Sequence, residues 1–421
     1  MKQIIPPVKG TRDFYPEQMA FRNWLYEKIQ VLSQKYGYQE YDGPVLEYLD
    51  LYTNKTSEEI LKTQAFTLQD RDGRFLILRP ELTPTFARMV AQKAEQLPKE
   101  IRWFSFGRAW RYEQPQKGRG REFFQWEINL LGPESPEADA EILAIAADYL
   151  KSLNLTPKEV VIKVSDRSFM QEELKSYGLT EEQIMPVFRI IDRKNKISAE
   201  QFNQDLAKEG INLEQAKKIE KLLSEKDFSK SPWLSKIFES LKLYEDIFEY
   251  FEFDPTIIRG FDYYTKTVFE AWDRGEGFKR ALFGGGRFDN LTSQIGGPKV
   301  PGVGMAPGDY AAQVILEEYG KMPNISPKTA AVLVTVFNPE LSSESLKLAA
   351  ELRKANINTE LWAENEAKLD KQLKYADQKG IPYVLIIGPE EAEKNLVTLK
   401  DLENKSQQTL SLDEAISKLT S

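Results

Sequence analysis

The 421-residue chain contains no histidine and no cysteine. Without histidine, imidazole acid–base catalysis, histidine nucleophiles and histidine metal ligands are excluded. Without cysteine, disulfides and thiolate metal sites are excluded, and the chain is compatible with a reducing compartment. A bound metal would need carboxylates and substrate oxygens as ligands, which suits Mg²⁺. Chemistry must therefore rest on positioning and on charge stabilisation by Arg, Lys, Gln and Glu.

Long apolar runs are also absent. No stretch approaches the length of a membrane span, and residues 1–7 do not have the pattern of a signal peptide, so we expect a cytoplasmic protein. The formal net charge of −8 argues against general attraction to nucleic acid. Contact with nucleic acid would need local basic patches, for which the candidates are Lys117, Arg119 and Arg121, and the helically spaced Lys368, Lys371 and Lys374.

The order of predicted elements indicates two domains, in keeping with a length too great for one ordinary core. Residues 1–322 predict an α+β domain on an antiparallel sheet, with a helical insertion at about residues 166–250. A return to strand is predicted at 256–258. A linker by composition at 323–327 precedes an α/β domain at 328–421, where apolar strands alternate with helices and predict a parallel sheet.

The segment 111–125 carries four cationic side chains, two glycines and a proline between strand-like runs at 102–110 and 126–131. This pattern predicts a hairpin with a long basic tip. Arg111, Glu113 and Gln125 alternate toward one face, where each needs a polar partner. The arrangement suits a polyanion such as a nucleoside triphosphate, whereas a solvated charged hairpin is the alternative for an isolated basic loop.

A second segment, 79–84, follows a predicted strand and opens a helix. The Glu81 carboxylate and the Thr83 hydroxyl suit an ammonium ligand. Thr83 is also predicted to be the N-cap of the helix, because Pro84 follows it.

Three further segments need close backbone approach or small residues. Arg259 stands beside Gly260, which allows a carboxylate or phosphate to approach a bidentate cation. Tyr263 and Tyr264 follow, and at least one of them is predicted to pack in the sheet. Three glycines at 284–286 require a bare backbone, although such a run alone more often marks a bend. Residues 300–308 predict a small-residue strand that leads into a helix at 309.

In this order, the segments resemble the class II aminoacyl-tRNA synthetases, and specifically the histidyl-tRNA synthetase family. The resemblance covers essentially the whole chain. Residues 9–14 resemble the family's opening, and Gly43–Pro44 resembles the end of motif 1, which lies at the dimer interface. Motif 2 corresponds to 111–125, the histidine-specific signature to 259–270, and the second signature with motif 3 to 284–308. The C-terminal domain resembles the family's anticodon-binding domain.

The resemblance implies an enzyme that activates L-histidine with ATP and transfers it to the 3′ end of tRNA(His). It also implies a homodimer with Mg²⁺ expected. Arg111 would hold the α-phosphate and Arg119 the outer phosphates. Glu113 would hold the adenine amino group, Phe123 would stack on adenine, and Arg287 would complete the ATP site.

Arg259 is implied at the α-phosphate and the substrate carboxylate, and with Arg111 it would be catalytic. The tip residues Gln116 and Arg121 would contact the acceptor end of tRNA. The implied histidine site comprises Arg259 together with Glu81, Thr83 and Gln125 at the amino group, and Tyr263, Tyr264 and Asn129.

Several positions depart from the family pattern, among them Gln114, which replaces a common Arg, and Phe124, where the family often has His. Residues 308–311 (Gly-Asp-Tyr-Ala) stand where motif 3 usually carries an Arg that sandwiches adenine. Asn129 replaces a carboxylate that faces the imidazole, and it can still hydrogen-bond a neutral ring. The rival interpretation is a non-catalytic, histidine-sensing regulatory paralog of an ATP phosphoribosyltransferase. Such paralogs lose the ATP-binding arginines and the C-terminal domain, so Arg111, Arg119, Arg259 and residues 328–421 favour the synthetase.

Overall fold

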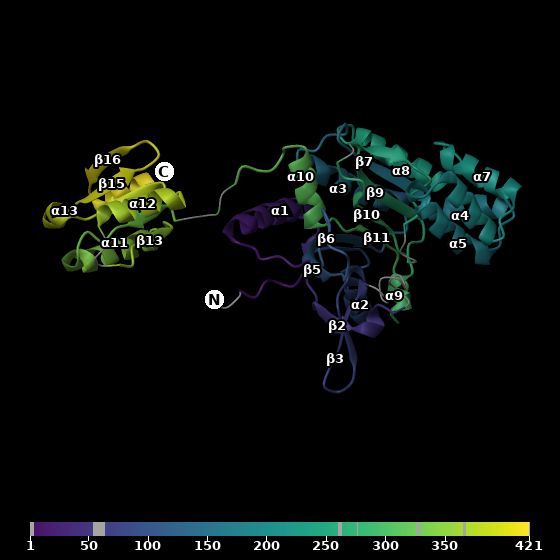
Figure 1. Ribbon diagram of the computed structural model, residues 1–421, viewed down its shortest axis with the longest axis horizontal. Coiled ribbons are helices and arrows are strands. Elements are labelled where there is room, and N and C mark those ends of the chain that lie inside the picture. The colour runs from purple at the N-terminus through teal and green to yellow at the C-terminus, as the bar shows by residue number, and fades with distance from the viewer. Residues whose placement is uncertain are drawn as a thin grey trace. The chain divides into compact units, whose positions relative to one another are not determined.

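The computed structural model describes residues 4–53, 64–259, 263–275, 277–325, 327, 330–364 and 368–420. It divides into two compact units, Met1–Asn324 and Ile325–Ser421 (Figure 1). Gly260, beside the predicted cation, lies outside the described residues, as do Ser326 of the predicted linker and Lys328 at the predicted start of the second domain. None of the helices in the described ranges has the length and apolar character needed to cross a membrane.

An eight-stranded sheet forms the centre of the first unit. The six central strands, which run in space from β5 to β7, pair antiparallel with one another, and this confirms the predicted α+β fold. The edge strands β1 and β8 pair parallel with their neighbours. The sheet is therefore mixed at its edges. In spatial order the strands are β1 (Gln39–Glu40), β5 (Ile101–Trp110), β6 (Glu122–Leu131), β11 (Gly302–Met305), β10 (Ala281–Arg287), β9 (Thr267–Asp273), β7 (Val160–Asp166) and β8 (Phe251–Phe253).

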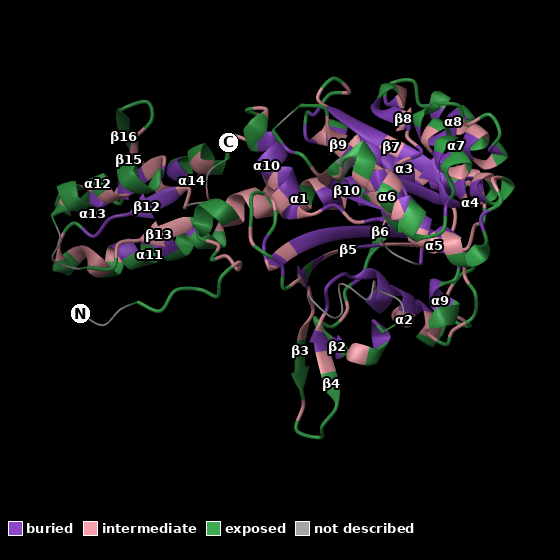
Figure 2. Cartoon of the chain, turned by 45° about the vertical axis from the view of Figure 1, so that its right-hand side comes forward, coloured by how far each residue is buried: buried purple, intermediate pink, exposed green. Residues whose placement is uncertain are grey.

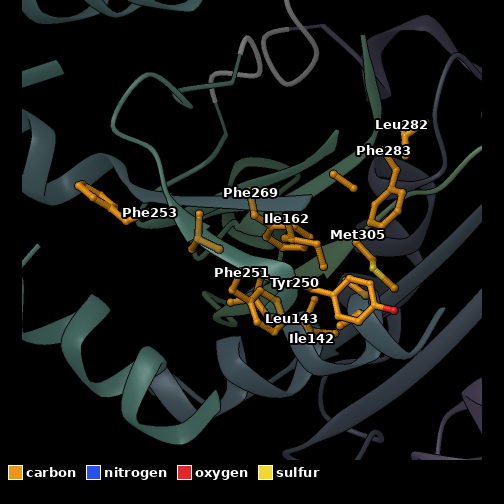
Figure 3. Close-up of a cluster of buried hydrophobic side chains, with 14 of the residues drawn as sticks. Ile142, Leu143, Ile162, Tyr250, Phe251, Phe253, Phe269, Leu282, Phe283 and Met305 are labelled. Carbon is orange, nitrogen blue, oxygen red and sulfur yellow. The ribbon is translucent and has the colours of Figure 1, made fainter. Parts of the chain in front are cut away.

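One face of this sheet packs on α3 (Pro136–Ser152), a helix that is buried along most of its length (Figure 2). Ser135 caps the helix by accepting a hydrogen bond from the Ala138 amide at 3.3 Å, and Pro136 follows at the first helical position. Figure 3 shows Leu143 of the helix with Ile162 and Phe269 of the sheet in the core. Burying each such side chain stabilises the fold by about 1.5–3 kcal/mol. The helices α1 (Pro16–Lys35) and α10 (Asp309–Glu318) flank this layer.

A smaller sheet has the order β2 (Leu46–Tyr48), β4 (Phe75–Leu78) and β3 (Phe66–Gln69). The hairpin of β3 and β4 is confirmed as antiparallel. Its turn is held by the Asp70 carboxylate, which accepts from the backbone amides of Asp72 at 3.0 Å and Arg74 at 2.8 Å. The helix α2 (Thr83–Lys93) follows β4.

Between β7 and β8 the chain forms five α-helices: α4 (Arg167–Ser176), α5 (Glu181–Asp192), α6 (Ala199–Lys208), α7 (Leu213–Ser224) and α8 (Pro232–Lys242). The strand predicted at 256–258 is wrong. Asp254 instead closes a turn, since its side chain accepts from the Thr256 amide at 3.0 Å and its carbonyl accepts from the Ile257 amide. Ile257 and Ile258 are buried after the turn, and β8 lies just before it.

The second unit has one five-stranded sheet in the order β13 (Thr359–Leu361), β12 (Val332–Val334), β14 (Tyr383–Ile386), β15 (Val397–Asp401) and β16 (Ser406–Leu410). The first three strands are parallel, as expected, but β15 and β16 add antiparallel. The purely parallel sheet is therefore corrected to a mixed one. Neither β15 nor β16 was predicted. Strand β16 is polar and mostly exposed, so it lacks the apolar run of a buried strand, and β15 is buried over only three residues. The helices are α11 (Ser342–Lys354), α12 (Leu369–Lys379), α13 (Pro389–Lys394) and α14 (Leu412–Thr420).

Candidate functional site

A cavity of about 740 Å³ opens on the sheet face opposite α3. The alternation of β6 explains why, because Trp126 and Ile128 point into the core with α3, while Gln125 and Asn129 point to the other face and line the cavity. Eleven of the residues singled out in the sequence line this one space: Glu81, Thr83, Arg111, Glu113, Arg119, Phe123, Gln125, Asn129, Arg259, Tyr263 and Tyr264.

The basic tip is shorter than expected. Strands β5 and β6 pair from Ile101 with Leu131 up to Trp110 with Glu122, so residues previously assigned to the tip belong to β6. A backbone bridge between Gln116 and Arg119 closes the remaining loop. At its base, the Arg111 guanidinium donates from Nε to the Pro80 carbonyl at 2.9 Å, which holds this side chain at the cavity.

Four guanidinium groups converge on the cavity: those of Arg111, Arg119, Arg259 and Arg280. Burial lowers the pKa of Arg119 to about 10, and the positive charges of Arg111 and Arg280 add to this effect. Burial likewise lowers the pKa of Arg111, with Arg259 contributing repulsion. These cations repel one another in a space of low dielectric, so the site favours a ligand with several negative charges.

Arg280 was not predicted. Its Nη1 atom is buried and has no hydrogen-bond partner among the described residues, although the side chain lines the cavity. A buried donor without a partner is costly and calls for one. The signal in the sequence was a cation directly before the strand of the glycine run, but nothing there distinguished it from the neighbouring Lys279.

Glu113, expected at adenine, is held by a second site residue in this structure. Arg119 donates from Nη2 to its Oε1 at 2.6 Å. The structure therefore pairs a carboxylate expected to bind adenine with a cation expected to bind phosphate.

Arg259 has a left-handed backbone, with φ of +66°. Such a conformation costs a residue with a Cβ about 1–2 kcal/mol and is concentrated at functional sites. Its Nη1 donates to Glu270 at 3.1 Å. Although burial opposes the charge, Tyr264 and Glu270 raise the pKa of Arg259, so the guanidinium stays cationic. Gly284 leaves the space this guanidinium occupies, which explains the bare backbone required there.

The acidic end of the cavity suits an ammonium group. The hydroxyl of Tyr263 donates to Glu81 Oε2 at 3.0 Å. Gln125 donates from Nε2 to the Ala306 carbonyl at 3.2 Å, which leaves its buried Oε1 with no hydrogen-bond partner in the described part of the chain. The prediction that Thr83 is an N-cap is wrong, because α2 begins at Thr83 and Leu82 occupies the cap position without a side-chain bond.

The two tyrosines of the signature both pack and line the cavity. Their ring centroids lie 4.8 Å apart, and both side chains belong to a buried apolar cluster. Tyr263 and Tyr264 therefore have a packing role together with their place at the site, so the choice between the two functions does not arise.

At the cavity floor, Asn129 is tied to a residue that the sequence did not single out. Asn129 Nδ2 donates to Glu127 Oε1 at 2.7 Å. Burial raises the pKa of Glu127 to about 8, against the opposing hydrogen bond from Asn129. Glu127 lies two residues from both Gln125 and Asn129 in β6. All three side chains therefore lie on the same face of the strand, the face of the cavity.

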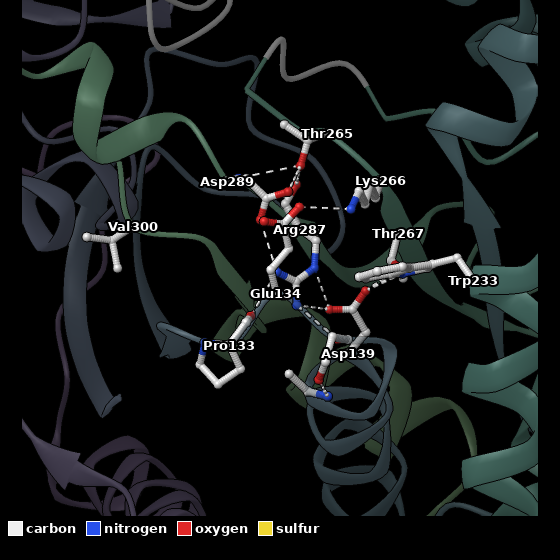
Figure 4. A network of polar contacts seen from close by, with 12 residues as sticks. Pro133, Glu134, Asp139, Trp233, Thr265, Lys266, Thr267, Arg287, Asp289 and Val300 are labelled. Carbon is white, nitrogen blue, oxygen red and sulfur yellow. Dashed lines mark hydrogen bonds and ion pairs between the residues drawn. The ribbon is translucent and has the colours of Figure 1, made fainter. Parts of the chain in front are cut away.

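Arg287, assigned to ATP, requires a correction. Its side chain is 0% exposed and does not line the cavity. It donates to Asp139 Oδ1 at 2.8 Å and to Asp289 Oδ1 at 3.0 Å, in the network shown in Figure 4. The guanidinium therefore joins α3 to β10 as a structural ion pair.

The departure at 308–311 anchors the fold. Asp309 accepts from Arg12 Nη2 at 2.5 Å and from the Phe124 amide at 3.0 Å. Burial raises the pKa of Asp309, while Arg12 opposes the shift. The Arg12 guanidinium in turn lies 3.6 Å from the centroid of the Tyr310 ring, and Tyr310 lines the cavity. Arg12 and Asp309, from distant segments, thus form an ion pair next to a tyrosine of the cavity lining.

Gln116 and Arg121 lie in the tip outside the cavity lining. Arg121 donates from Nε to the Glu113 carbonyl at 3.1 Å, and its guanidinium lies 3.9 Å from the Tyr112 ring centroid. Their contact with the acceptor end of tRNA stays a prediction.

Comparison with known proteins gives a consistent result along the chain. Residues 10–308 match the family model described as histidyl-tRNA synthetase, and residues 331–421 match the model described as anticodon binding domain. The histidine–tRNA ligase of Leptospira biflexa serovar Patoc is 38% identical over 424 residues, which cover 98% of this chain and 96% of the relative. That of Pyrococcus horikoshii is 34% identical, with 99% of each chain covered. The crystal structure of histidyl-tRNA synthetase from Nostoc sp. PCC 7120 shares the fold, with a TM-score of 0.81 at 24% identity and coverage of 100% and 99%.

Proposed function

Since the chain belongs to the histidyl-tRNA synthetase family, we propose that the cavity is the site where it activates histidine. The chain is an aminoacyl-tRNA ligase that joins L-histidine to tRNA(His) at the expense of ATP. The observation that carries the assignment of the site is the convergence of four guanidinium groups on a cavity that also holds a carboxylate and an amide oxygen for an ammonium group; this oxygen has no hydrogen-bond partner among the residues that the structure describes.

In the first step, a carboxylate oxygen of histidine attacks the α-phosphorus of ATP, and pyrophosphate leaves. Arg259 lines the cavity and would neutralise both the attacking carboxylate and the α-phosphate. Arg111 would hold the α-phosphate from the other side, with Arg119 and Arg280 at the outer phosphates. No proton has to be moved by the protein, which fits a site without histidine or cysteine.

Binding of ATP would separate the Arg119–Glu113 pair. The polyphosphate offers Arg119 a stronger partner, since it carries several negative charges. The carboxylate of Glu113 is then free to accept from the adenine amino group, and Phe123 lies beside Arg111 with 5.3 Å between the guanidinium carbon and the ring centroid, available to stack on the base.

Histidine would bind with its ammonium group between Glu81 and the Oε1 atom of Gln125. Thr83 would add a hydroxyl at the same end. The imidazole of the bound histidine would extend toward Tyr264 and Asn129. The buried walls there exclude water and leave side-chain polar groups as the ring's hydrogen-bond partners.

In the second step, a ribose hydroxyl of the terminal nucleotide of tRNA attacks the acyl carbon of the adenylate. The bond from that carbon to the phosphate oxygen breaks, and AMP leaves with the hydroxyl proton taken up by its phosphate. Gln116 and Arg121 of the tip would contact the acceptor end. We propose that the second unit, which matches the anticodon-binding model, contacts the anticodon stem through exposed cations that include Lys371 and Lys374.

Mg²⁺ is expected to enter with ATP. Among the described residues there is no group of three or more acidic side chains that could hold a metal ion alone. The cavity does have Asp192 and Glu270, and one or two carboxylates with substrate phosphates are the usual Mg²⁺ environment. These two residues fit the ion, which would offset phosphate charge.

We also propose a cytoplasmic homodimer. The edge strand β2 and the residue before it expose apolar side chains, with Val45, Leu46 and Tyr48 exposed by 37%, 43% and 51%. Such edges are normally covered, and a second copy of this chain would cover this one. Sedimentation of the wild type and of Tyr48→Glu tests this, because the variant should sediment as a monomer.

The decisive experiment is pyrophosphate exchange into ATP with each amino acid, without tRNA. Exchange driven by histidine alone is the expected result. Binding of histidine without exchange would instead indicate a regulatory paralog, an alternative that the full-length similarity to histidine–tRNA ligases does not favour.

A further inference from the structure

The floor of the cavity contains a buried pair whose second member has no assigned role. Asn129 is 1% exposed and lines the cavity, while Glu127 is equally buried but is not part of the lining. The two are joined by the hydrogen bond of 2.7 Å from Asn129 Nδ2 to Glu127 Oε1. Glu127 therefore reaches the substrate through side chains of the lining, of which Asn129 is the partner at 2.7 Å and Thr83 is a second hydrogen-bond partner.

A side-chain amide has a donor end and an acceptor end, and a ligand meets one or the other depending on its orientation. Here the donor end is directed at Glu127, which accepts one of its two N–H bonds. The acceptor end, Oδ1, lies against Gly304 of β11, the residue that pairs directly with Asn129 across the sheet. A Cβ atom at 304 would overlap Oδ1, so glycine leaves room for this orientation.

Gly304 also lines the cavity, so the end of the amide that lies beside this part of the lining is the oxygen. An oxygen can accept a hydrogen bond from an imidazole N–H, whereas the NH₂ group would meet the ring nitrogen that carries a lone pair. The orientation of one amide thus decides which tautomer and which edge of the ring fits.

We propose that Glu127 is a positioning residue for histidine selection, which holds the Asn129 amide so that Oδ1 accepts from the substrate's ring N–H. Glu127 accepts from the Asn129 amide, and Asn129 Oδ1 in turn accepts from the substrate. The inference rests on the proposed histidine site and deepens it.

The test is pyrophosphate exchange with separate KM values for histidine and ATP. Glu127→Met removes the acceptor at nearly constant volume and frees the amide to rotate. We expect the KM for histidine to rise by about 10-fold or more, equivalent to about 1.4 kcal/mol, while the KM for ATP changes less than about two-fold. An unchanged histidine KM would overturn the proposal.

Two variants distinguish positioning from a loss of structure. Adding Asn129→Asp to Glu127→Met replaces the amide by a carboxylate, which accepts hydrogen bonds in either orientation because both ends are oxygens. The KM for histidine should then return close to the wild-type value. Glu127→Gln keeps a carbonyl acceptor and should retain most of the affinity. A double variant as weak as the single one, together with a weak Glu127→Gln, would show that Glu127 acts only in packing.

Glu122→Met is the matched control, since Glu122 is a buried carboxylate on the opposite face of β6 that pairs with Arg108 at 2.8 Å. Its histidine KM should match the wild type. Wild-type exchange is measured beside the variants: if histidine drives none, the proposed function fails, whereas normal wild-type exchange with unaffected variants rejects only the role of Glu127.

Discussion

The Nη1 atom of Arg259 occupies the position where a side chain on Gly284 would begin. The two residues come from different segments, and the strained backbone of Arg259 directs its guanidinium across β10 toward the cavity. The glycine run is thus part of a strand and not a bend, because its bare backbone accommodates the central cation of the site.

Gly284→Ala should therefore displace the guanidinium and lower histidine-dependent exchange by about 100-fold or more, the usual effect of losing one preorganised charge contact. A double-mutant cycle with Arg259→Ala supplies the control. Gly284→Ala should cost less stability in the Arg259→Ala background, where the guanidinium is absent, as measured by thermal unfolding. Some cost should remain, because the added Cβ still contacts the Phe269 carbonyl. Equal costs in both backgrounds would contradict the relationship.

Arg280→Met should raise the KM for ATP by about 10-fold, because the buried Nη1 loses its phosphate partner while the histidine end is untouched. Histidine affinity, measured by calorimetry without ATP, should stay the same. Arg274→Met is a suitable control from the same connection, as Arg274 pairs with Glu252 at 2.7 Å away from the cavity lining. An equal effect of both variants would point to general charge.

The pH dependence of stability should carry the signature of Glu127, whose pKa is raised from 4.5 to about 8 by burial. Between these values the unfolded chain has lost the proton that the folded chain keeps, so stability falls as pH rises, by about 1.4 kcal/mol per pH unit within the window. Above pH 8 the loss is complete. Glu81, Arg79 and Tyr41 are ionisable groups close to this carboxyl group.

Glu127→Gln does not titrate at this position. The free energy of unfolding in urea should therefore increase for the variant relative to the wild type as pH rises from 4.5 to 8. Below pH 4.5 the difference between the two proteins should be constant. Parallel curves across the whole range would show that the carboxyl group is ionised normally in the fold.

Arg287→Met should destabilise the first unit by about 3–5 kcal/mol, because Asp139 would be left as a buried charge without its partner. The folded fraction should retain the wild-type KM for ATP, in line with the position of Arg287 outside the cavity. Lys266→Met removes the neighbouring, more exposed pair with Glu134 (Figure 4) and should cost less than about 1 kcal/mol. A specific loss of ATP affinity in Arg287→Met would restore its nucleotide role.

The sequence predicted the residues that line the cavity better than the bonds between them. Glu81, Gln125 and Arg259 were found because their chemistry repeats in segments with strong turn and glycine signals. Arg287 was misassigned because a cation after a glycine run looks the same whether it meets a ligand or a buried Asp139 on a distant helix.

Long-range partners account for the other differences. Thr256–Ile258 has strand-forming residues, but the Asp254 turn decides its conformation. The role of Asp309 depends on Arg12, 297 positions earlier, and no local pattern reveals that pair. Strand β16 was missed because an exposed strand carries little apolar periodicity.

The cavity is walled by Arg, Glu, Gln, Asn and aromatic side chains, and the whole chain has no imidazole of its own. The ring of bound histidine is therefore the only imidazole in the binary complex. With ¹⁵N-labelled histidine and unlabelled protein, the two ring-nitrogen resonances would report the tautomer at the Asn129 oxygen without overlapping protein signals. Because the protein contains no histidine, the protonation state of the bound histidine can be followed directly, without signals from protein imidazoles.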